Sequence, residues 1–133
     1  MTQIQKWICL LIIGTITTIN CKAQDAVDIL EKRANELHLA IVRSDEALRQ
    51  DFIEQNYSRK MLEDYGMDKH LGMFERLHND FAQSEITSLK IKDDKLYMAV
   101  ERKSDGHRLT FVINYDPGEE FKFDGFSIEA GEF

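Results

Sequence analysis

The side chains with the clearest chemical potential in this sequence are Glu75 and His78, which stand three residues apart in a stretch with helical spacing. Residues three apart share a face of a helix, so this carboxylate and imidazole could act together as an acid/base pair or as metal ligands. The structural alternative, which we favour, is a surface ion pair or a half-buried histidine bonded to the backbone. If the fold forms a pocket, we expect His78 and Tyr57 to be its polar groups.

The other three histidines give weaker indications. His38 is next to Leu37, a predicted core residue, and we interpret it as a packing residue. We expect His70 to face solvent, and His107 adjoins a predicted turn. None of the histidines belongs to an H-E-x-x-H motif, so we expect no metal site.

The sequence also lacks the motifs of nucleophilic and nucleotide chemistry. No serine is followed by lysine three residues later, and there is no G-x-S-x-G, G-x-G-x-x-G or Walker motif. We therefore expect no catalytic residue and no cofactor, and we interpret the protein as a non-enzymatic binding or accessory module. The alternative is a small enzyme of the isomerase or hydratase type, in which His78 works with Glu75 or Tyr57 as a general base in a pocket.

The N-terminus is typical of a secretory signal. An uncharged apolar run from Trp7 to Ile19 follows Lys6, and small residues precede a predicted cut after Ala23 or Gln24. We expect residues 1–24 to be the signal peptide and residues 25–133 to be a single exported domain, periplasmic or secreted.

Two alternatives would keep the domain at a membrane. The apolar run could remain as an uncleaved anchor, or Cys21 could carry a lipid. Asn20 fits a lipidation motif poorly, because a small residue is expected before the modified cysteine. Ordinary cleavage would instead remove both cysteines, Cys9 and Cys21, and leave a domain without disulfides.

The charge balance excludes one class of partner. The chain has 17 basic and 24 acidic residues, a formal net charge of −7. An acidic domain is repelled by phosphate backbones, so we expect no nucleic-acid partner. A small ligand, a protein partner or a homodimer formed through a sheet remain the partners that we consider.

The first half of the domain has helical spacing. Apolar residues recur every three or four positions over 25–43, 45–56 and 68–81, which predicts three helices. Ser44-Asp45 suits the start of the second helix, and Ser58 suits the start of a short segment that Gly66 ends.

The second half alternates with a period of two. Strands are predicted around 86–91, 96–100 and 109–115, with turns at 104–106 and 116–118. In the last strand the pairs Phe121/Phe123 and Phe126/Ile128 have opposite parity, which predicts a β-bulge at Gly125. Helices followed by a meander predict an α+β domain, with N-terminal helices packed on a curved antiparallel sheet of about four strands.

Six segments of the chain carry a further pattern: 44–48, 52–53, 56–58, 73–81, 107–111 and 124–128. In their order they resemble the nuclear-transport-factor-like, or cystatin-like, superfamily, and they are similar to the accessory domain of secreted β-lactamase-like serine hydrolases. The resemblance implies a cone-like fold and no particular reaction, because the superfamily includes isomerases, dehydratases, binding modules and dimerisation domains. It also raises a third function, an inhibitor or lid for a separate secreted hydrolase.

Overall fold

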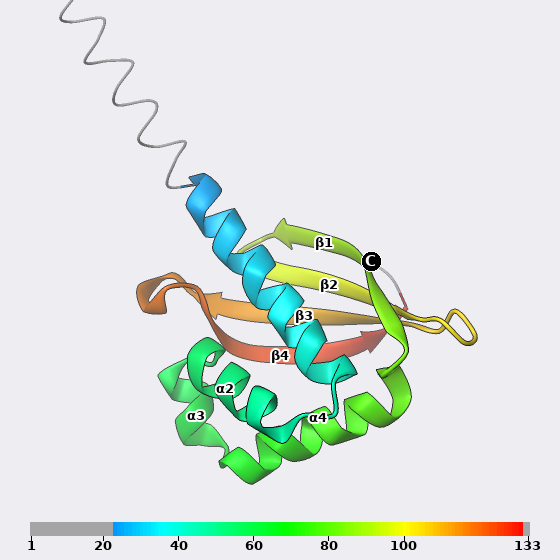
Figure 1. Cartoon of the computed structure of the whole chain (residues 1–133). Helices are drawn as coiled ribbons and strands as arrows, with labels where there is room; N and C mark the ends of the chain where they lie inside the picture. The colour runs from blue at the N-terminus through cyan, green and yellow to red at the C-terminus, as the bar shows by residue number, and fades with distance from the viewer. Residues whose placement is uncertain (1–22, 132–133) are drawn as a thin grey trace, which may run out of the picture.

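The computed structural model describes residues 23–131, and Figure 1 shows its helices gathered on one side of a four-stranded sheet. The predicted signal segment, with its apolar run and Cys21, lies outside the described residues. No helix within residues 23–131 is both long and apolar enough to cross a membrane.

A long helix over residues 23–42 runs diagonally across one face of the sheet (Figure 1). Its buried stripe has the helical spacing seen in the sequence and includes Leu30, Ala34, Leu37 and Ile41. Arg49 closes its C-terminal end, because its side chain donates to the main-chain carbonyls of Ala40 and Arg43, each at 3.0 Å. A cation at this position complements the negative end of the helix dipole.

Three shorter helices follow: α2 (Glu46–Asn56), α3 (Arg59–Asp64) and α4 (Met67–Phe81). Two of them start as predicted, since Asp45 accepts a hydrogen bond from the amide of Leu48 and Ser58 accepts one from the amide of Met61. These caps satisfy amide groups that the first turn of a helix leaves unpaired.

The second half of the chain forms a meander of four antiparallel strands in the order β1-β2-β3-β4. The strands are β1 (Ser84–Lys92), β2 (Lys95–Arg102), β3 (Arg108–Asp116) and β4 (Lys122–Ala130), and the sheet does not close into a barrel. The predicted α+β class, with helices first and an antiparallel sheet second, is therefore confirmed.

Residues in the hairpin turns have positive φ angles, and the sequence predicted only some of them. Gly106 has the predicted positive φ, +72°. The turn between β1 and β2 places both Asp93 and Asp94 at positive φ, 52° and 59°, which matches the right-handed twist of the flanking strands.

The bulge in β4 is confirmed and its extra residue is Asp124. Asn114 pairs with Gly125 and Tyr115 pairs with Phe123, which leaves Asp124 without an opposite residue on β3. A second irregularity, which we did not predict, leaves Thr87 unpaired in β1.

The start of β4 corrects one prediction. Phe121 lies before the strand rather than within it, because the chain turns through Glu120 and Phe121 at φ 55° and 61°. Arg33 of the N-terminal helix stabilises this turn by donating to the carbonyl of Glu120 at 2.8 Å and to the Asn56 side chain at 2.8 Å. The turn therefore depends on residues from three distant segments.

Candidate functional site

An open hollow of about 840 Å³ lies where α3 and α4 approach the bulged part of β4. The hollow therefore lies at the junction of the helices and the bent end of the sheet. Residues that line it include Met61, His70, Gly72, Met73, Asp124 and Phe126.

The α4 wall of the hollow contains a glycine in the middle of a helix. Gly72 has an ordinary helical backbone, and a Cβ atom built on it would meet no atom within 4 Å. Glycine inside a helix costs stability relative to alanine. The missing side chain therefore widens the hollow beside Met73, at some expense to the helix.

His70 lines the hollow, and its ring meets the ring of Tyr57 edge to face with centroids 4.9 Å apart. Tyr57 itself does not line the hollow, so the expectation that it would be a polar group of the pocket is wrong. Tyr57 is 1 % exposed, and its hydroxyl is buried without a hydrogen-bond partner among residues 23–131. Burial raises the pKa of Tyr57 far above its usual range, because the anion would lose its hydration. The phenol therefore stays neutral at physiological pH.

His70 is buried, so the prediction that it faces solvent is wrong. Its Nε2 lies 3.1 Å from the carbonyl oxygen of Met61, which can only accept, so Nε2 carries the hydrogen. The ring also lies between Tyr57 and Tyr65. These contacts with the Met61 carbonyl of α3 and with the Tyr65 ring that follows α3 bury position 70. His70 is the site residue that the sequence reasoning missed.

Charged groups of both signs form the rim of the hollow, and several are already paired. Lys60 forms an ion pair with Asp64 at 2.9 Å, and this contact raises the pKa of Lys60. Lys69 lies over the Tyr65 ring, 5.6 Å from its centroid. Arg76 adds a further positive charge at the α4 wall.

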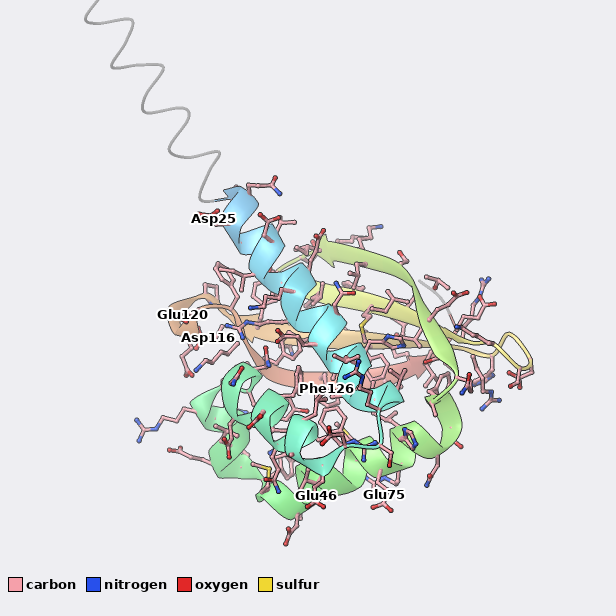
Figure 2. All side chains as sticks on the ribbon, viewed as in Figure 1. Asp25, Glu46, Glu75, Asp116, Glu120 and Phe126 are labelled. Atoms are coloured by element: carbon pink, nitrogen blue, oxygen red, sulfur yellow. The ribbon has the colours of Figure 1, made fainter. Side chains whose placement is uncertain are left out.

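The residues that we first considered for acid/base chemistry do not come together. His78 is half-buried, and its Nδ1 lies 2.9 Å from the carbonyl oxygen of Ile41 on the N-terminal helix. Glu75 is exposed on the side of α4 that faces away from the sheet (Figure 2). Neither lines the hollow, and the imidazole that touches Tyr57 is that of His70.

His38 has a structural role as a packing residue, as the sequence indicated. Its Nε2 lies 3.0 Å from the hydroxyl of Ser84, which itself donates to the carbonyl of Phe81 at 2.6 Å. Burial lowers the pKa of His38, and repulsion from Lys103 adds to the shift. A neutral imidazole is therefore built into the junction between the N-terminal helix and β1.

A sequence signal for the hollow was present but faint. An isolated glycine within a helical pattern is unusual and often has a packing or functional reason. Gly72 falls between Leu71 and Met73 in such a pattern, so it could have been singled out.

Comparison with protein-family models, with curated proteins and with solved structures finds no match for this chain. Within residues 23–131, no three His, Cys, Asp or Glu side chains come together to hold a metal ion.

Proposed function

We propose that this protein is an exported, non-enzymatic binding module that takes its ligand in the hollow between α3, α4 and β4. The observation that carries the proposal is Gly72, whose open flank widens the hollow at a cost to the helix. The nuclear-transport-factor-like resemblance of the sequence is compatible with this function, because that superfamily includes binding modules. The exported location rests on the signal pattern of residues 1–24.

Binding is favoured over catalysis by the state of the polar groups around the hollow. His70 uses Nε2 on the Met61 carbonyl, and Asp124 accepts a hydrogen bond from Ser58 at 2.7 Å. Lys60 is held by Asp64. A general base requires a poised group within reach of a substrate proton. Asp124 and Lys60 already have structural partners, and in His70 only Nδ1 is able to accept a proton.

The lining of the hollow indicates the chemistry of its ligand. Met61, Met73 and Phe126 offer an apolar and adaptable surface, since methionine fits irregular shapes well. The rim carries Lys69 and Arg76 as well as acidic groups. We therefore expect a ligand with an apolar body and polar or charged ends.

The proposal can be tested at Gly72 with the fluorescent dye anilinonaphthalene sulfonate, which has an apolar body and an anionic end. The folded chain should bind the dye, and Gly72→Ala should leave binding unchanged because its methyl group takes little space. Gly72→Trp should fill the hollow and abolish the dye signal, with circular dichroism used to verify folding. Equal dye binding by the two variants, or no binding by the parent protein, would overturn the proposal.

A further inference from the structure

The register of the sheet shows which backbone groups of β4 point away from its neighbour. The amide of Gly131 donates to the carbonyl of Arg108 at 2.9 Å, so these two residues form a hydrogen-bonded pair. Such pairs alternate along an antiparallel ladder. Residues 125, 127 and 129 therefore bond to β3, whereas the amides and carbonyls of Phe126, Ile128 and Ala130 point outward.

Only the first part of this outward edge is covered. The amide of Ser58 donates to the carbonyl of Phe123 at 2.8 Å, and Tyr57 forms a parallel bridge with Phe123. Beyond the Asp124 bulge, no backbone hydrogen bond from another described element reaches the outward groups of Phe126, Ile128 or Ala130. The covering segment thus stops where the hollow begins.

The opposite edge of the sheet is protected in a different way. β1 contains the irregularity at Thr87 and carries Lys90 and Lys92, and bulges and lysines are features that discourage strand pairing. The open part of β4 has neither a lysine nor a proline between Gly125 and Ala130. β4 has a bulge of its own at Asp124, but residues 125–130 lie beyond it and pair regularly with β3. This part of β4 is therefore better suited than β1 to accept another strand.

The open edge adjoins the hollow on its apolar side. Phe126 lines the hollow, and Ile128, two residues on, lies on the same face of the sheet with 39 % of its surface exposed. A strand added beside β4 would place alternate side chains on that face. Those side chains would then pack against Phe126 and Ile128 and along the hollow.

We propose that the occupant of this site is an extended segment of a partner protein, which adds to the sheet as a fifth strand along the Phe126–Ala130 edge. The inference rests on the proposed function of the hollow and specifies its ligand. Main-chain hydrogen bonds to Phe126, Ile128 and Ala130 hold the segment, and apolar residues at alternate positions enter the hollow.

The charge of this protein indicates which residues the partner segment carries. Asp124 and Glu129 are the charged residues of β4 beside the open edge, and the chain carries a net charge of −7. The hollow is lined by three basic and three acidic side chains, so the preference comes from the open edge and from the net charge of the chain. Opposite charge steers association, so the segment carries basic residues beside its apolar positions. A second copy of this acidic chain is disfavoured for the same reason.

A phage-displayed library of random short peptides tests the proposal with the full chain as bait. Ile128→Pro removes the outward amide while leaving the bonds to β3 intact, and prolines are tolerated at such edge positions. Ile128→Val keeps the amide and serves as the matched control. Peptides enriched on the parent protein should alternate apolar and basic residues, bind the valine variant normally and bind the proline variant about tenfold or more weakly. Thermal melts verify that both variants fold.

Three results would overturn the proposal: no enrichment over bare support, enriched peptides that bind Ile128→Pro as well as the parent, or a stable homodimer that Ile128→Pro dissociates. The last result would identify a second copy as the occupant. Dye binding is also measured for the Ile128→Pro variant. Residue 128 lies on the open edge of β4 and does not line the hollow, so this variant should still bind the dye. Retained dye binding with no peptide selection would refute only the strand addition, whereas loss of dye binding by the parent protein refutes the hollow itself.

Discussion

The hydroxyl of Ser58 donates a hydrogen bond of 2.7 Å to the carboxylate of Asp124, and this contact joins the first turn of α3 to the extra residue of the β4 bulge. Ser58 is fully buried, and its hydroxyl oxygen also accepts from the amide of Met61. The side chain of Ser58 therefore joins the helix and the strand that line the hollow. The backbone amide of Ser58 also donates to the carbonyl of Phe123, at the first part of the β4 edge.

Replacement of Ser58 by alanine should lower the free energy of unfolding by about 1–2 kcal/mol. The substitution removes a helix cap and also a buried hydrogen bond to a charged group. Urea denaturation followed by circular dichroism measures the loss. Ser58→Thr keeps the hydroxyl and is the control that should lose less. If Ser58→Ala is as stable as the parent, the Ser58–Asp124 contact does not stabilise the fold.

Replacement of Gly72 by alanine should raise the free energy of unfolding by about 0.5–1 kcal/mol. Alanine is the better helix former, and its methyl group enters open space. Differential scanning calorimetry would show a higher melting temperature. Gly106→Ala is the contrasting variant, because Gly106 has φ +72° and alanine there should destabilise the hairpin. A fall in stability for Gly72→Ala would show that the α4 wall is closed at this point.

Replacement of Tyr57 by phenylalanine should leave stability unchanged or raise it by up to about 1 kcal/mol. The hydroxyl of Tyr57 is buried without a partner among the described residues, so its removal ends an uncompensated desolvation. The ring contacts with Phe52 and His70 remain. Chemical denaturation measures the change. A clear loss of stability would mean that the hydroxyl has a partner, such as a bound water, in solution.

The stability of the protein should fall in mildly acidic solution through His38. Its pKa in the folded state lies below the ordinary value of 6.5 because of burial and then of repulsion from Lys103. The unfolded chain therefore binds more protons than the folded chain once the pH falls below about 6.5. The stability that neutral His38 contributes is complete above that pH and is lost as the pH falls through the folded-state pKa.

The measurement for this prediction is the free energy of unfolding at several pH values for the parent and for His38→Gln. Glutamine is able to hydrogen-bond to Ser84 without taking up a proton. Its stability should decline less steeply between about pH 7 and pH 5 than that of the parent. Equal slopes for the two proteins would assign the acid sensitivity to other groups.

Much of the secondary structure could be predicted from the sequence. The stripe of the N-terminal helix, the caps at Asp45 and Ser58 and the parity change at Gly125 all depend on residues that are neighbours along the chain. Local steric and hydrogen-bonding preferences act over the same range, which is why these patterns could be interpreted without a fold. The candidate site was harder to predict, because Glu75 and His78 share a helix but neither lines the hollow.

The errors fall where contacts between distant segments override local pattern. Phe121 fits a strand by its spacing, yet Arg33 of the N-terminal helix holds the carbonyl of the preceding residue, Glu120, in a left-handed turn. His70 fits an exposed position, yet the end of α3 supplies a carbonyl and a ring that bury it. Neither contact leaves a signal in the adjoining residues.

The sequence by itself determined the acidic charge, most of the helices and strands, and the bulge in the last strand. Only the tertiary structure decided that Gly72 opens onto a hollow, that Tyr57 lies beside His70 and that Ser58 meets Asp124 across a separation of 66 residues. The physical reason for this division is that the spacing of apolar residues shows only which face of a helix or strand is buried. The partner of that face is chosen by packing the whole chain, and a site is a property of such pairings.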